Sequence, residues 1–214
     1  MAHPEPSKSG SLVTMMKKFG VTLVLLLAVA GYLSGQTAQE IVLQLDPAQT
    51  AADFGLEDVL HSVRGSFALK RGAIRFDPTT GVAGGEVVFD ATTGNSGNGS
   101  RDHKMHKDVL ESQRYPEIVF RPDHAEGKMA ATGPCVFQVH GKFGIHGAEH
   151  DVTIPVEVDF HDNQWTAKAT FKVPYVKWGM KNPSLLFLRV GDAVSIAFRG
   201  SGSLTNSSER AERR

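Results

Sequence analysis

Apolar and polar residues alternate along most of the chain beyond residue 40, with a period of two. The longest run covers residues 135–145, where Phe137, Val139 and Phe143 are separated by polar residues such as Gln138 and Lys142. This pattern is typical of a β-strand with one face in a core and the other in water. Further runs of the same kind lie at residues 63–69, 74–76, 87–91, 118–120, 152–160, 165–173 and 194–198.

Residues that favour turns separate these runs, notably at residues 77–81, 146–148 and 162–163. About eight strands joined by tight turns predict an all-β fold, in which an antiparallel meander closes into a barrel. One interruption is expected to be helical, because Met105, Val109 and Leu110 lie among polar neighbours at the spacing of a short amphipathic helix. We expect this helix to cover one mouth of the barrel or to pack along its wall.

The residues predicted to face inward mix phenylalanines with small side chains, and this composition has two interpretations. The small residues Gly65, Ala91, Gly141, Ala167 and Ala169 would leave room along the axis. An eight-stranded barrel is wide enough to hold one slender ligand, but alternating large and small residues can also fill it completely. Periodicity alone leaves both a ligand cavity and a solid core open.

The N-terminal segment has the layout of a secretory signal peptide. Lys17 and Lys18 precede an apolar stretch at residues 21–30, and small, mildly polar residues follow. The apolar stretch is shorter than the roughly 20 residues that cross a bilayer, so an uncleaved anchor is the less favoured alternative. We therefore expect a periplasmic or secreted protein in which Ala38 is the last residue removed.

This interpretation divides the chain into three parts. Residues 1–38 form an N-terminal extension and signal peptide, residues 39–204 form the barrel domain, and residues 205–214 form a polar, disordered tail. Translation could begin at Met1, Met15 or Met16, and the sequence does not choose among them.

Composition excludes several classes of function. The 214 residues carry 23 basic and 23 acidic side chains, so the chain has no overall field that would concentrate nucleic acid. The single cysteine, Cys135, rules out an internal disulfide framework and any multi-thiolate metal site, and its inward position predicts a small apolar core residue. No Gly-x-Ser-x-Gly motif is present to suggest serine hydrolysis.

Nine histidines raise the possibility of a metal site. His103 and His106 lie three residues apart on the predicted helix, and His146 and His150 flank a turn. Neither pair carries a ligand motif such as His-Glu-x-x-His, so we interpret them as solvated surface residues and predict neither a metal nor a cofactor.

Several segments closely resemble the YceI-like family of secreted lipid-binding domains, and together they cover about residues 41–204. One difference concerns the family's Arg-Asp-x-His-Leu segment, which here is Arg101-Asp102-His103-Lys104-Met105. The apolar position is kept, whereas Lys104 replaces the histidine. The matching segments are Val-Arg-Gly-Ser-Phe at residues 63–67, Gly-Ala-Ile-Arg-Phe-Asp-Pro at 72–78, Tyr-Pro-Glu-Ile-Val-Phe at 115–120, Gly-Lys-Phe-Gly-Ile-His-Gly at 141–147, and the segments 175–180 and 190–196.

The resemblance implies a lipocalin-like antiparallel barrel, without enzymatic activity, that sequesters a long isoprenoid such as a polyprenyl or quinone-like lipid. Arg101 is a candidate contact for the lipid head group. Trp165 is expected in the core and Trp178 at the rim of the opening. The candidate lining residues are Phe67, Phe76, Phe89, Phe120, Phe137, Phe143, Phe171 and Phe198, with Met105 and Val109 covering one end.

Two other functions are compatible with the residues. An enzyme could act on such a lipid through His103 and His106, or the domain could be a ligand-free structural or stress-related surface protein. A carrier could exchange its isoprenoid with a membrane or with a membrane partner such as a cytochrome. The sequence is compatible with a monomer or a homodimer.

We predict that the exported protein begins at Gln39, because the small residues before it suit cleavage after Ala38. Intact-mass measurement of the protein recovered from outside the cytoplasm tests this. A mature chain that still carries residues 21–30 would contradict the prediction and favour a membrane anchor.

Overall fold

The computed structural model describes residues 40–57, 62–129, 133–184 and 191–206. The predicted signal peptide and residues 207–214 of the predicted tail lie outside these ranges. Within them, no helix has the length and apolar character needed to cross a membrane. The strands of the described residues are β1 (Ile41–Leu45), β2 (Ala51–Glu57), β3 (Ser62–Phe76), β4 (Ala83–Asp90), β5 (Glu117–Gly127), β6 (Cys135–Ile145), β7 (Ala148–His161), β8 (Gln164–Val173) and β9 (Val194–Asn206).

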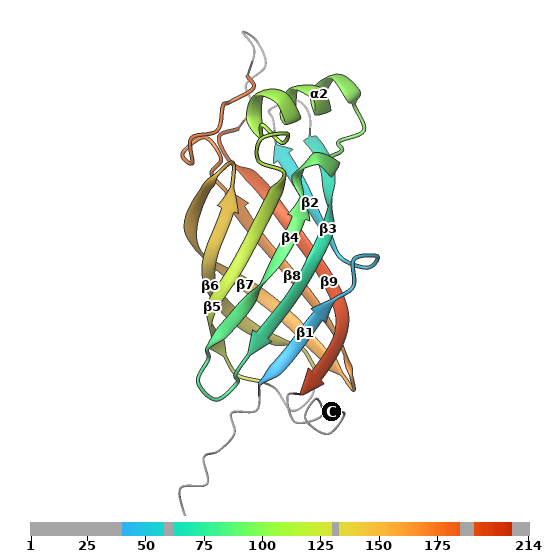
Figure 1. The fold of residues 1–214 in the computed structure, drawn as a ribbon, viewed down its shortest axis with the longest axis vertical. Helices are drawn as coiled ribbons and strands as arrows, with labels where there is room; N and C mark the ends of the chain where they lie inside the picture. Colours follow the sequence, from blue (N-terminus) through green and yellow to red (C-terminus); the bar gives the residue numbers. More distant parts are fainter. Residues whose placement is uncertain (1–39, 58–61, 130–132, 185–190, 207–214) are drawn as a thin grey trace, which may run out of the picture. The chain divides into compact units, whose positions relative to one another are not determined.

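All strand pairings are antiparallel, and the strands close into a barrel (Figure 1). From β3 to β9 each strand pairs with the next one along the chain. Both β1 and β2 pair with β3 on one side and with β9 on the other. Leu43 lies opposite Ile74 and Leu204, whereas Phe54 lies opposite Gly65 and Ile196. β1 and β2 therefore share one position, and the barrel has eight strand positions.

Asp46 helps to define the break between β1 and β2. Its backbone N–H donates to the carbonyl of Ser201 at 2.9 Å, and its carboxylate accepts from the N–H of Ala48 at 2.9 Å. Pro47 follows and has no N–H to offer a neighbouring strand. The chain thus leaves the barrel wall for a short turn and returns at Ala51.

The predicted fold of about eight antiparallel strands with one short helix is confirmed. The segments that form the eight strand positions differ in part from the predicted ones. The predicted runs at residues 63–69 and 74–76 belong to the single strand β3. The register of β3 against β4 shifts between Leu69 and Arg71. The inward-facing residues of β3 therefore have odd numbers before the shift and even numbers after it. The eighth position is filled by β1 and β2, which the sequence interpretation did not identify.

Three helical segments lie between β4 and β5 in the described chain: η1 (Ala91–Thr93), α2 (Gly99–Lys104) and the π-helical η2 (Met105–Val109). Asn98 caps α2, because its side chain accepts from the N–H of Arg101 at 3.0 Å. The segment lies over one end of the barrel (Figure 1), which we call the helix end. The opposite end, with the β3–β4 and β7–β8 turns, is the turn end.

Ion pairs cover an apolar patch on the outer wall. Val88 of β4 and Val119 of β5 lie opposite each other and are both buried, although their parity is opposite to that of the inward-facing Val87 and Phe89. Charged side chains of neighbouring strands bridge this region, and their aliphatic stems can shield apolar surface while their charged groups stay in water. The pairs are Lys70–Glu117, Arg71–Glu117, Arg71–Glu86, Arg121–Glu86 and Arg121–Glu149.

We predict that Glu117→Gln lowers the melting temperature at neutral pH by no more than about 3 °C, since exposed ion pairs contribute little. Hydrogen bonds from Arg71 and Lys70 hold the pKa of the Glu117 carboxyl at about 2, below its ordinary value of 4.5. A depressed carboxyl pKa contributes stability above pH 4.5 that is lost as the pH falls toward 2. The difference between wild type and variant should therefore close over that range.

Thermal unfolding between pH 7 and pH 2 measures this effect. Glu157→Gln is the matched control, because Glu157 is an exposed β7 residue without an ion pair among the described residues. A gap between wild type and Glu117→Gln that stays constant down to pH 2 would contradict the prediction.

Candidate functional site

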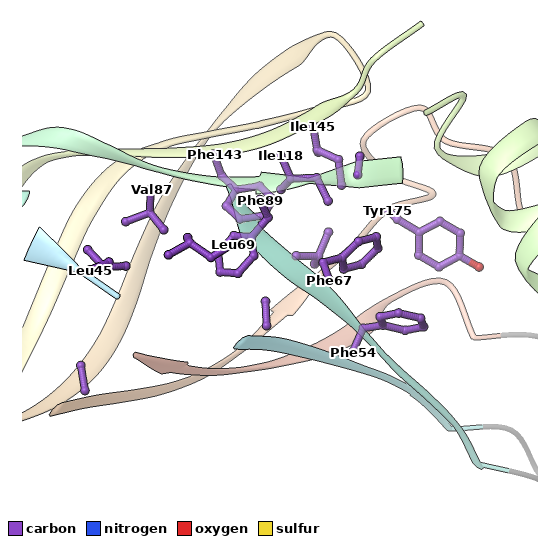
Figure 2. Packing of buried hydrophobic residues seen from close by; sticks show 14 of the residues in the cluster. Leu45, Phe54, Phe67, Leu69, Val87, Phe89, Ile118, Phe143, Ile145 and Tyr175 are labelled. Atoms are coloured by element: carbon purple, nitrogen blue, oxygen red, sulfur yellow. The ribbon is translucent and has the colours of Figure 1, made fainter. Parts of the chain in front are cut away.

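A cavity of about 770 Å³ occupies the interior of the barrel. Its lining includes inward-facing residues of every strand position together with residues of the helical segment. Figure 2 shows Phe54 and Phe67 side by side on neighbouring strands, with Tyr175 beyond them. The alternating pattern thus encloses a space, and the interior is not filled by its own side chains.

Every residue nominated as lining from the sequence faces this cavity, and Arg101 does so as well. The helix residues Met105 and Val109 contribute from α2–η2, as expected for a cover at one end. Contact between these residues and a ligand stays a prediction. The eight phenylalanines concerned are Phe67, Phe76, Phe89, Phe120, Phe137, Phe143, Phe171 and Phe198.

The small residues differ in what they do. Ala167 and Ala169 line the cavity, so their short side chains leave space within it. The ring of Phe54 occupies the space beside Gly65, because a Cβ on Gly65 would collide with it. A Cβ on Gly141 would collide with the backbone of Arg121. The glycines therefore allow close packing of the wall, whereas the alanines of β8 leave room inside it.

Aromatic side chains crowd the turn end of the cavity. The rings of Phe76 and Phe137 meet edge to face with centroids 5.5 Å apart. Trp165 lies opposite Phe160, and its indole N–H donates to the carbonyl of Ser203 at 3.1 Å. Trp165 is buried, as the sequence predicted. Large rings thus narrow the cavity at this end.

The polar side chains of the lining all lie at the helix end, which we therefore take as the mouth. They are Ser96, Asn98, Ser100, Arg101 and Lys104. The guanidinium of Arg101 donates from Nε to the Ser96 hydroxyl at 2.7 Å and from Nη2 to the Ser96 carbonyl at 2.8 Å. These bonds hold Arg101 against the loop before α2.

The other side of the mouth is formed by residues 175–183. Tyr175, Met180 and Pro183 all line the cavity. The hydroxyl of Tyr175 donates to the carbonyl of Gly191 at 2.8 Å, and burial raises the pKa of this phenol. Tyr175 therefore presents its ring, and not an acidic hydroxyl, to the space.

His106 anchors the helical segment and is not the solvated residue expected from the sequence. One ring nitrogen lies 2.8 Å from the carbonyl oxygen of Gly94, and the other lies 3.0 Å from the hydroxyl of Ser112. Both nitrogens are thus used in joining η2 to the segments on either side of it. His103 is exposed and stands apart from the lining, so the structure does not bring the two histidines into one site.

The second histidine pair is also structural. His146 lies 3.1 Å from Glu111, joining the β6–β7 turn to the end of the helical segment. His150 stacks on Trp178 with centroids 4.1 Å apart, and burial lowers its pKa. Trp178 also packs against Phe143, with ring centroids 5.8 Å apart. His150 lies opposite the cavity-lining Phe143, so Trp178 packs on the inward side of the wall, which fits the expected place near the opening. The expectation of solvated histidines is therefore wrong for His146 and His150.

Among the described residues, no group of three or more His, Cys, Asp or Glu side chains is placed to hold a metal ion. Cys135 is buried in the hydrophobic core, as the sequence predicted, and it is not a lining residue of the cavity.

Sequence reasoning missed the contribution of β1 and β2 to the lining. Leu43 and Leu45 come from β1, and Phe54 and Leu56 from β2. A signal was present, since both segments alternate with a period of two. The residues of 175–183 carry no such periodicity, and only their position in the fold brings them to the mouth.

Similar folds occur in solved structures of low sequence identity. Burkholderia cenocepacia BcnA has a TM-score of 0.62 at 19% identity, with 74% of this chain and 99% of that chain covered. A polyisoprenoid binding domain from Saccharophagus degradans has a TM-score of 0.58 at 14% identity, covering 74% and 95%. A Campylobacter jejuni YCEI protein has a TM-score of 0.50 at 17% identity, covering 62% and 79%.

These likenesses support the barrel architecture. No curated protein sequence matches the chain. The YceI-like domain matches residues 43–201, which span β1 to β9 and enclose the whole cavity, and the chain therefore belongs to the YceI-like family.

Proposed function

We propose that this protein is an exported carrier that holds a long-chain isoprenoid lipid, polyprenyl or quinone-like, inside its barrel. The observation that carries the proposal is the apolar cavity with polar side chains only at its mouth. A ligand with a long hydrocarbon tail and one polar head matches this distribution. The name of the Saccharophagus degradans domain adds support, because that similar barrel is described as polyisoprenoid binding.

The volume suits a chain of moderate length. At about 30 Å³ per heavy atom, the space that a water molecule takes in the liquid, 770 Å³ holds roughly 25 carbon atoms, or about five isoprene units. Burial of apolar carbon favours binding by about 0.8 kcal/mol per methylene before ordering costs are subtracted. A longer lipid would extend through the mouth. We expect weak discrimination by length, because one unit more or less leaves no polar group unpaired.

Binding without catalysis is favoured by the placement of the histidines. The enzymatic alternative would use His103 and His106, but His106 is hydrogen-bonded through both ring nitrogens and His103 lies off the lining. Neither is positioned toward a ligand in the cavity. The signal-peptide pattern of residues 1–38 supports export to the periplasm or the cell exterior.

We predict that protein isolated from its own host retains an isoprenoid, because the apolar cavity strongly disfavours an aqueous filling. Native mass spectrometry followed by organic extraction measures the bound mass and its identity. Protein that carries no lipid, and that also fails to bind added prenyl lipid after refolding, would instead support the ligand-free structural alternative.

We predict that Ala169→Phe reduces the bound isoprenoid severalfold, because a phenyl ring at this lining position occupies the space for the chain. Ala169 lies opposite Val156 and Phe198, and overpacking at such a site costs about 1–3 kcal/mol of stability. Lipid per folded protein is measured by extraction after the variant is shown to be folded by circular dichroism.

Thr170→Phe is the matched control, since Thr170 is the next residue of β8 and is exposed on the outer wall. It should leave the bound lipid unchanged. Equal lipid content in Ala169→Phe and wild type would contradict the placement of the chain beside β8.

A further inference from the structure

The charge at the mouth is of one sign. Arg101 and Lys104 are the charged side chains among the described lining residues, and no Asp or Glu lines the cavity within the same ranges. Their spacing of three residues places both on one face of α2. Two cations therefore face the polar end of a space that is otherwise apolar.

Lys104 differs from the lysines of the barrel wall. Lys70 and Lys142 each form an ion pair, with Glu117 and Asp151 respectively. Lys104 is half-buried and makes no ion pair within the part of the chain that the structure describes. A partly buried ammonium group without a partner is costly, and a bound anion would remove that cost.

Two carboxylates near the mouth have other partners. Asp102 accepts hydrogen bonds from the backbone N–H and the hydroxyl of Ser96, which lower its pKa. Asp192 accepts from the side-chain amide of Asn182 at 2.8 Å. Two guanidinium nitrogens of Arg101 donate to Ser96, and these bonds fix the position of the side chain in the ligand-free protein. The remaining N–H groups of the guanidinium can donate to a ligand.

We propose that the mouth binds an oxyanion head, so that the preferred ligand is an acidic isoprenoid such as a prenyl phosphate. The phosphate would lie between Lys104 and Arg101, and the prenyl chain would extend toward β8. A guanidinium fork and an ammonium group together suit a phosphate. A neutral quinone or alcohol would leave both cations without a counter-charge. This inference rests on the proposed function and narrows its ligand class.

The test compares geranylgeranyl phosphate with geranylgeraniol, two probes with the same 20-carbon tail, about four isoprene units, which fits the estimated capacity. Binding of each to delipidated full-length mature protein is measured by isothermal titration calorimetry. We expect the phosphate to bind at least tenfold more tightly, with the preference shrinking at high salt. Inorganic phosphate alone should not displace bound geranylgeranyl phosphate, because it lacks the tail.

Lys104→Gln removes the charge and leaves a polar side chain that is one atom shorter. We expect it to weaken geranylgeranyl phosphate about tenfold and to leave geranylgeraniol within about twofold. Lys107→Gln is the matched control, since Lys107 is an exposed lysine of the same helical segment that does not line the cavity. It should change neither affinity. The melting temperature of ligand-free Lys104→Gln should not fall, whereas loss of a structural lysine would lower it.

The outcomes separate the two proposals. If both probes bind with equal affinity, if Lys104→Gln weakens both alike, or if inorganic phosphate displaces the lipid, the anionic-head inference is overturned while lipid carriage stands. If neither probe binds, the proposed function itself fails, and the head-group inference fails with it.

Discussion

Closure of the sheet at eight strand positions is the constraint on which the rest of the structure depends. Closure pairs every described strand with a neighbour on both of its sides. It also fixes the width of the interior, which at this strand number is suited either to packed side chains or to one slender ligand. The choice between these two outcomes then depends on the size of a few inward residues.

Those residues divide the interior into ends with different chemistry. Phe76, Phe137 and Trp165 narrow the turn end, whereas Ala167 and Ala169 leave room in the middle. The polar residues of the mouth all come from one segment between β4 and β5. An apolar tail and a polar head can therefore be accommodated in only one orientation. The distribution of apolar and polar lining residues would therefore set the orientation of a bound lipid.

The helical segment is held at the mouth by histidines that carry no catalytic arrangement. His106 joins η2 to Gly94 and Ser112, and His146 joins the β6–β7 turn to Glu111. These contacts secure α2, and with it Arg101 and Lys104, relative to the strands. Structural histidines here position the charges of the opening.

The sequence predicted the barrel and the inward-facing residues well, because every second residue of a regular strand faces the same side of the sheet. Phe137 and Phe143 face the cavity for that reason alone. The presence of the cavity was not predictable, since Gly65 is as small as Ala169, yet the space beside it is filled by the ring of Phe54 from β2, a strand that the sequence pattern did not identify. His106 contacts Gly94 and Ser112 within the β4–β5 connection, and His150 contacts Trp178 from a later part of the chain; the spacing of the histidines encodes neither role.

A crystal structure of the protein isolated from its native host, without delipidation, tests the central claim most directly. The account predicts continuous elongated electron density beside Ala169 and Phe198, ending in a head group near Lys104. An interior filled by inward-turned aromatic side chains, with no space between them, would contradict it.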